Sequence, residues 1–482
     1  MDGNTGTDTN TGKSLRGGAL GLGDVFMQAI TQTAPATAIL FTIPFITSKA
    51  GVASPISYLL AFLLVLVLGV TLTQLAKHLP SAGGYYTYIS HTINPRAGFL
   101  TSWLYFLYAP TIAGYSLAFV GAVTEETIKV NYGIDFPWWL FLIITGSLVS
   151  IASYRGIEIS AKFLVILGVT EILVVLVLSF WSLAHPGDGG INIKSFNPYN
   201  APGFGGLAMG TVFSIFALSG WEGVAPLAEE SKDPRRVLPK AIMYSITAMG
   251  IFLVFCSWSL LIGWGTNNID SFVASLENPA FILARKFWGN GWVLILFALI
   301  NSMLAVAIAS NNSATRVWYA MARSGSMPLF LAKIHPKFQT PVNAVFLQMI
   351  VMNTVGLGLG YLIGPKMEFD FMGVVITFTL AIIYAMGNIG VMRYYRKEKR
   401  HEFNVVLHVI FPVVGIISLF YVAYNSLIPW PEAPIGYAFW VVVVWLLLGV
   451  VVLLIMKWTK KDKWAKNAGM VTVNDADNKL YK

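Results

Sequence analysis

Long apolar runs, each of about 20 residues, are the feature of this 482-residue sequence that most restricts its fold. A run of that length spans the hydrocarbon core of a bilayer as one α-helix. Lipid offers no partner to backbone N–H and C=O groups, so such runs are helical when they cross a membrane. We therefore predict an all-α integral membrane protein with twelve transmembrane helices, at about 24–48, 55–78, 98–124, 137–154, 160–184, 207–228, 239–264, 290–315, 341–363, 370–392, 404–427 and 435–457.

Composition supports the membrane interpretation and excludes several other classes of protein. Hydrophobic residues make up 56% of the chain and charged residues 11%, whereas a soluble protein carries roughly 25% charged residues. A single cysteine, Cys256, and six scattered histidines predict no disulfide framework and no metal or haem site. We expect no cofactor, no catalytic residues and no enzyme activity. The first 22 residues are polar and lack the pattern of a signal peptide, which predicts a disordered tail.

The distribution of basic residues explains the net charge of +9. With twelve spans, 26 of the 32 Lys and Arg residues lie on the side of the two chain ends. The other six lie on the opposite side, namely Lys49, Lys129, Lys194, Arg285, Lys286 and Lys366. By the positive-inside rule, both termini are expected in the cytoplasm of a multi-pass cell-membrane protein. The basic excess then reflects topology and not binding to nucleic acid.

One membrane domain at 23–457 is expected between cytoplasmic tails at 1–22 and 458–482, because every loop is short. The first and sixth spans differ from the other ten. QTAPAT (32–37) interrupts the first span, and the sixth carries Ser219-Gly220, Glu222 and Pro226. Paired interruptions at corresponding positions indicate a transporter site built from discontinuous helices. The halves would be 23–184 and 207–392, inverted because each holds five spans, with peripheral helices at 404–457. Alternatively, these Gly and Pro residues only kink or pack the helices.

Three motifs resemble those of the amino acid–polyamine–organocation (APC) superfamily of secondary transporters. They are PSAGGYYTY (80–88), FALSGWEGVAPLAEESKDPRRVLPKAI (216–242) and RVWYAMARSGSMP (316–328), and the resemblance extends over about 20–457. It implies a ten-helix, 5+5 inverted-repeat core of the LeuT-like type with two further helices, acting as an amino acid permease. Two departures from the usual pattern stand out. Thr33-Ala34-Pro35-Ala36-Thr37 replaces a glycine-rich turn, and Glu171 takes the place of a lysine that many sodium-independent members carry.

The interrupted spans supply the candidate substrate site. Helix N-termini present free N–H groups and a positive dipole end, while unwound carbonyls suit a cation. We assign a substrate carboxylate to the backbone of the first break and an ammonium group to the carbonyls of the sixth span. The substrate-binding candidates are Thr33, Ala34, Pro35, Ala36, Thr37, Phe216, Ala217, Leu218, Ser219, Gly220, Trp221, Tyr108, Asn301 and Ser302. The alternative for the aromatic residues among them is packing in the core or against lipid.

Carboxylates inside the membrane are costly, and they are the candidates for proton coupling or gating. Glu171 lies halfway along span 5, where it either carries a proton or holds span 1 as a protonated, hydrogen-bonded clasp. Glu222 either gates the pathway or caps the second half of span 6. Glu229, Glu230, Lys232, Arg235 and Arg236 form either a solvated charge run or, with Arg323, an inner gate.

The sequence thus predicts secondary transport of amino acids by alternating access, coupled to protons or possibly to sodium, or running as exchange. A carrier of the same fold for polyamines, other amines or potassium is the first alternative, and it calls for more acidic groups facing the cavity. A channel would show a pore loop or rings of charge, and a membrane enzyme a convergent catalytic set. We find neither pattern in the sequence.

Overall fold

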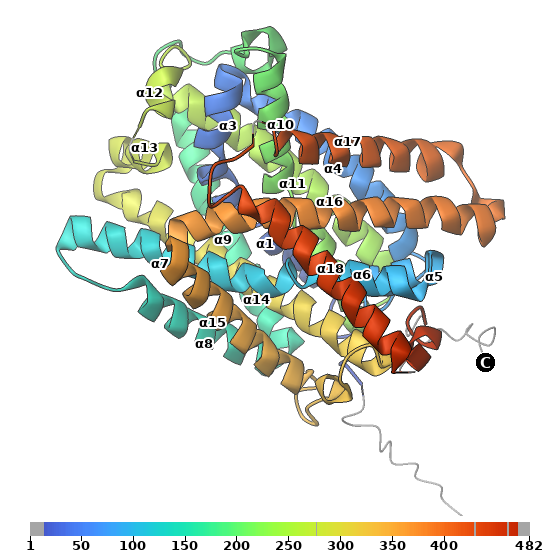
Figure 1. The fold of residues 1–482 in the computed structure, drawn as a ribbon. Coiled ribbons are helices and arrows are strands. Elements are labelled where there is room, and N and C mark those ends of the chain that lie inside the picture. Colours follow the sequence, from blue (N-terminus) through green and yellow to red (C-terminus); the bar gives the residue numbers. More distant parts are fainter. Residues whose placement is uncertain (1–13, 276, 429, 460–461, 471–482) are drawn as a thin grey trace, which may run out of the picture.

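A bundle of long helices forms the protein (Figure 1). The computed structural model describes residues 14–275, 277–428, 430–459 and 462–470. Apart from two isolated β-bridges, helices are the regular secondary structure of these residues. The polar tails expected at 1–22 and 458–482 lie partly outside the described residues.

The first half of the chain forms α1 (Leu22–Gln32), α2 (Pro35–Leu40), α3 (Thr42–Ala50), α4 (Ser54–Ala76), α5 (Tyr85–Thr92), α6 (Pro95–Tyr105), α7 (Ala109–Tyr132), α8 (Trp138–Tyr154) and α9 (Ile157–Ala184). The second half forms α10 (Phe204–Ala217), the 3₁₀ segment η4 (Trp221–Glu230), α11 (Pro234–Trp264), α12 (Ile269–Val273), α13 (Pro279–Trp288), α14 (Val293–Ser324), α15 (Val342–Ile363), α16 (Pro365–Lys397), α17 (Phe411–Asn425), α18 (Tyr437–Trp458) and η9 (Asp462–Lys466). Several of these helices begin with proline in their first turn. N–H groups there have no partner within the helix, so the N–H that proline lacks costs no hydrogen bond.

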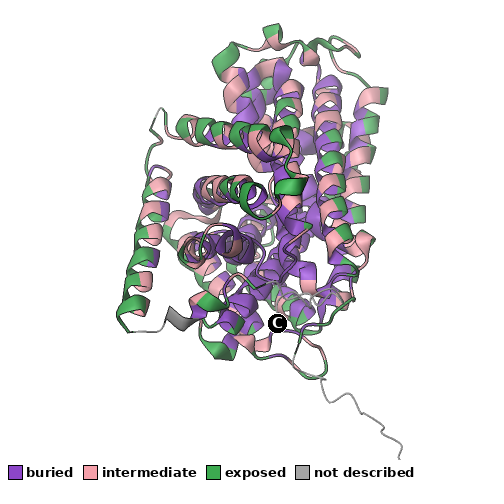
Figure 2. Ribbon diagram, turned by 90° about the vertical axis from the view of Figure 1, so that its right-hand side faces the viewer, coloured by how far each residue is buried: buried purple, intermediate pink, exposed green. Residues whose placement is uncertain are grey.

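Ten helical stretches of the described chain are long and apolar enough to cross a membrane. Helix α8 is apolar but shorter, and α3 and α4 form parts of one continuous stretch. The protein is therefore an all-helical, multi-pass membrane protein, while the count of twelve spans and the inverted repeat stay predictions. Buried residues occupy the interior and exposed residues line the outer faces (Figure 2). Helix α18 is the most peripheral span, with 11% of its apolar window buried.

Glycine allows helices in the core to approach closely. A Cβ on Gly114 of α7 would lie 2.5 Å from the backbone oxygen of Met352, and one on Gly356 of α15 would lie 2.7 Å from the oxygen of Gly114. Small residues at such crossings let two backbones pack against each other inside a membrane. This contact sets the position of α7 against α15, and α7 lines the site described below.

The described segments nearest the two chain ends pack against the same end of the bundle, which we call the terminal end. Leu20 forms a parallel β-bridge with Ser231, directly after η4. Near the other chain end, Trp464 packs against Gly325, just beyond α14. Glu229 of η4 pairs with Arg323 of α14, so the two regions are neighbours.

Candidate functional site

The first break lies between α1 and α2. Helix α1 ends at Gln32, and Ala34 adopts a left-handed conformation with φ 55° and ψ 69°. Pro35 then opens α2 at the first helical position, where proline is favoured. The helix interruption therefore covers Thr33 and Ala34 and is shorter than the stretch 33–37 suggested by the sequence.

The second break lies between α10 and η4 and touches the first. Helix α10 ends at Ala217, and Gly220 has a φ of 117°, a conformation that side-chain-bearing residues rarely adopt. A Cβ on Gly220 would lie 2.5 Å from the backbone oxygen of Gln32. The end of α1 and the start of η4 are thus in direct contact.

Glu171 of α9 reaches the N-terminus of α2. Its Oε2 accepts a hydrogen bond of 3.0 Å from the Ala36 N–H, and its side chain is fully buried. The neighbouring Thr37 N–H donates a longer bond, 3.4 Å, to the Ser302 hydroxyl. The carboxylate therefore meets an amide N–H of span 1, and the clasp expected from the sequence would have donated to carbonyl groups instead. An acceptor at a helix N-terminus complements the positive end of the helix dipole.

Glu222 binds the backbone of the second break. Its Oε2 accepts a hydrogen bond of 3.1 Å from the Gly220 N–H, two residues before it. The side chain is buried, and the hydroxyls of Tyr108 and Tyr384 face it. The contact is compatible with the capping interpretation, and capping and gating both stay predictions.

A small inner cavity of about 70 Å³ lies beside the two breaks. Seven of the substrate-binding candidates line it, namely Thr33, Ala34, Thr37, Tyr108, Phe216, Ala217 and Ser219. The Thr37 hydroxyl is buried there without a hydrogen bond in the described structure and is available to a ligand, whereas the Tyr108 hydroxyl faces Glu222.

The other seven candidates do not line this cavity. Asn301 points to α9, where its side-chain amide donates to the Leu167 carbonyl, and the Trp221 ring stacks on Tyr384 at 5.5 Å. The remaining five, Pro35, Ala36, Leu218, Gly220 and Ser302, are buried behind the wall or form the break itself. None of these five places a side chain in the cavity, and Ser302 acts through its hydroxyl, which accepts from the Thr37 N–H behind the wall.

Several cavity residues were not predicted from the sequence. Ile112, Tyr115 and Ser116 of α7, Met303 and Val306 of α14, and Phe369 and Ile376 of α16 all line the cavity. A signal was available only for α7, where Ile112, Tyr115 and Ser116 follow Tyr108 at spacings of four, seven and eight. These spacings place residues on one face of a helix.

A larger outer cavity of about 590 Å³ lies toward the end of the bundle opposite the terminal end. The rings of Phe41 and Phe369 line both cavities. Phe119 lies between them, 4.8 Å from Phe41 and 4.3 Å from Phe369 between ring centroids. The three rings form an aromatic layer that separates the inner cavity from the outer one.

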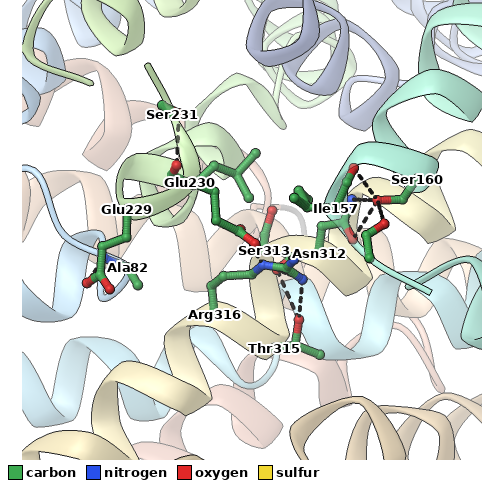
Figure 3. Close-up of polar contacts among 12 residues, drawn as sticks. Ala82, Ile157, Ser160, Glu229, Glu230, Ser231, Asn312, Ser313, Thr315 and Arg316 are labelled. Carbon is green, nitrogen blue, oxygen red and sulfur yellow. Dashed lines mark hydrogen bonds and ion pairs between the residues drawn. The ribbon is translucent and has the colours of Figure 1, made fainter. Parts of the chain in front are cut away.

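Two arginine–glutamate pairs join η4 to α14 at the terminal end. Arg323 makes two bonds to Glu229, of 2.9 and 2.6 Å, and Glu229 also accepts from the Ala82 N–H. Arg316 makes two bonds to Glu230, of 2.8 and 3.1 Å, with both side chains fully buried (Figure 3). The bundle is therefore tied together at this end.

We expect the Arg316–Glu230 pair to be indispensable for stability. Replacing Arg316 with methionine leaves the Glu230 carboxylate buried without its partner, which costs about 3–5 kcal/mol. The double variant Arg316→Met, Glu230→Leu should regain most of that loss, since no buried charge then remains. Thermal unfolding in detergent tests both. Arg316→Met melting at the parent's temperature would contradict the expectation, and Lys366→Met, in an exposed pair with Glu126, is the control.

A cavity enclosed by apolar helices and flanked by two helix ends is typical of a membrane transport protein. Residues 24–468 match the amino acid permease family, and the chain belongs to that family, within the APC superfamily. It is similar to the low-affinity putrescine importer PlaP of Escherichia coli (strain K12), at 26% identity over 361 residues that cover 72% of this chain and 75% of the importer.

Two relatives from Bacillus subtilis (strain 168) are similar at the same level. The serine/threonine exchanger SteT is 25% identical over 378 residues, which cover 77% of this chain and 82% of the exchanger. The branched-chain amino acid permease BcaP is 26% identical over 318 residues, covering 62% and 65%. The names of these three transporters give different substrates, so membership of the family defines a permease but not its substrate.

Proposed function

We propose that this permease takes up amino acids together with protons, and that the terminal end faces the cytoplasm. The proposed orientation rests on the positive-inside rule, with 26 of the 32 basic residues on that side. Ion pairs close the bundle at that end, and the outer cavity lies toward the other. The described conformation is then closed to the cytoplasm, with the aromatic layer above the inner cavity.

The substrate carboxylate would bind at the N-terminus of α2, and the ammonium group at the C-terminal end of α10. The first of these carries a positive dipole end and the second a negative one. The Thr37 hydroxyl in the cavity adds a polar partner. A zwitterion of small size complements this arrangement, with its two charges directed toward the two breaks.

The contact that carries the proposal of proton coupling is the hydrogen bond from Ala36 to Glu171. While Glu171 is ionised, its carboxylate occupies the helix end that a substrate carboxylate would use, and the two negative charges repel each other. Protonation removes the charge of Glu171 and weakens its hold on the Ala36 N–H. Substrate and proton then bind together, which is the requirement for symport.

Uptake of labelled compounds into proteoliposomes tests the function. We expect a neutral amino acid to accumulate when the outside is more acidic, and to equilibrate without accumulation when the gradient is collapsed. Equal accumulation with and without the gradient would contradict proton coupling. The sidedness needs an introduced cysteine, because the native Cys256 is buried. A cysteine at the exposed position 401 at the terminal end (His401→Cys) should react with a reagent confined to the outside only in molecules whose terminal end faces outward.

A carrier for organic amines is the second candidate, and the outer cavity favours it. The cavity is lined by three carboxylates, Glu126, Glu277 and Asp370, and by two basic groups, Arg285 and Lys366. This excess of negative charge attracts cations. A diamine lacks the carboxylate that the α2 terminus would bind, so uptake of putrescine without uptake of any amino acid would favour this candidate over the first.

A further inference from the structure

The segment 464–470, which follows the last membrane helix, docks onto the terminal end of the bundle. We call it the docking segment. Trp464 is 4% exposed and its ring lies 5.6 Å from that of Phe99 on α6, while Ala468 is 2% exposed. Burial of a tryptophan ring is a large apolar contribution for so short a segment. The sequence alone suggested only a polar tail here.

His91 of α5 connects the docking segment to α16. Its Nδ1 lies 3.2 Å from the Gly469 carbonyl oxygen, and its Nε2 lies 3.0 Å from Oε2 of Glu398. Both partners are acceptors, and a neutral imidazole can donate to only one of them, whereas the imidazolium donates to both. The titratable groups that face the ring are Glu398 and Tyr394 of α16, and the docking segment faces it with a backbone carbonyl.

The surface beneath the docking segment belongs to the elements that close the terminal end. A cavity of about 290 Å³ is lined by Ser81, Tyr86, Thr87, Ala320, Arg323 and Ser324 on one side and by Asn467, Ala468 and Met470 on the other. Arg323 is the partner of Glu229, and the Tyr86 hydroxyl bonds to Ser324 at 2.7 Å. The docking segment thus contacts α5 at His91 and lies against Gly325, just beyond the end of α14.

We propose that the surface formed by α5, α6 and the end of α14 binds the docking segment, and that the bound segment holds this end of the transporter closed. For substrate to leave on this side, α5 and α14 have to separate, and the docking segment bridges them. Its release therefore raises the transport rate. The effect on transport rests on the proposed function, and the docking itself does not.

A cysteine pair tests docking and its consequence together. A Cβ on Gly469 would lie 3.3 Å from the His91 Cβ, just below the about 3.5–4.5 Å found in disulfides, and 3.0 Å from the His91 Cα and N. The two segments therefore have to shift apart by a few tenths of an ångström, which brings the Cβ atoms into the range of a disulfide. The one native cysteine, Cys256, is buried in α11. We expect His91→Cys, Gly469→Cys to form the disulfide on oxidation, to lose transport by about tenfold or more, and to recover when reduced. Gly469→Cys alone is the control. The proposal would be overturned if the two cysteines failed to cross-link. It would also be overturned if the cross-linked protein transported as fast as the same protein after the disulfide is reduced.

Release of the segment is tested with Trp464→Ala, and Trp458→Ala is the matched control because its side chain is exposed. Hydrogen exchange at residues 80–92 should become faster in Trp464→Ala and stay unchanged in Trp458→Ala. Unchanged exchange in Trp464→Ala would overturn the proposal even in a preparation that transports nothing.

Discussion

Replacement of Gly220 with valine is expected to abolish substrate binding, with a loss of affinity of about 100-fold or more. Two effects act in the same direction. The φ of 117° is strained for any residue with a Cβ, at a cost of order 1–3 kcal/mol. In addition, the Cβ would lie 2.5 Å from the backbone oxygen of Gln32, so the end of α1 has to move away from η4. Both consequences distort the two helix ends to which the substrate charges are assigned.

Binding to the purified protein in detergent measures this effect, with Gly205→Val as the matched control. Gly205 lies in the first turn of α10, and a Cβ there would meet nothing within 4 Å. The control variant should therefore bind like the parent. If Gly220→Val is folded, inserts into the membrane and binds substrate with the parent's affinity, the substrate site lies elsewhere.

Replacement of Glu171 with glutamine should separate exchange from accumulation. The amide oxygen can still accept from the Ala36 N–H, so α2 keeps its contact with α9. Glutamine carries no titratable proton, and the variant should lose the ability to concentrate substrate. With a gradient of about two pH units, a one-proton symporter can concentrate substrate by up to about 100-fold, since each unit corresponds to about 1.4 kcal/mol.

Two proteoliposome assays measure this separation. Counterflow exchange should persist in Glu171→Gln, while accumulation driven by the pH gradient should fall to equilibrium. Glu158→Gln is the control, because Glu158 lies on the same helix, α9, and is partly exposed in a pair with Arg16 at the terminal end. A Glu171→Gln protein that still accumulates substrate like the parent would leave Glu171 as a structural contact between α9 and α2.

The sequence predicted the helical membrane architecture because length and hydropathy govern spanning segments directly. Helix ends were less predictable. Helices α11, α14 and α16 have 31, 32 and 33 residues and extend past the apolar runs. Their polar ends stay helical because they pack on other segments at the ends of the bundle. Hydropathy does not detect this kind of contact.

The candidate site was predictable only in part. Proline is favoured at the first position of a helix and glycine tolerates the φ of 117°, and this signal led to Pro35 and Gly220, although the left-handed residue of the first break is Ala34. Ile376 and Met303 line the same cavity but are apolar residues within apolar runs, where a wall residue looks like a lipid-facing one. Similarly, Arg316 lies at the end of a predicted span, where charges are usually solvated, yet its pair with Glu230 is fully buried.

Counting the protons taken up when substrate binds tests the central claim most directly. The claim is that substrate and the ionised Glu171 compete for the α2 N-terminus. Purified parent protein in weakly buffered solution, at a pH where Glu171 is ionised, should take up about one proton for each amino acid bound. Glu171→Gln should bind the amino acid and take up none. Saturating binding to the parent without proton uptake at any pH between 5 and 9 would contradict the account.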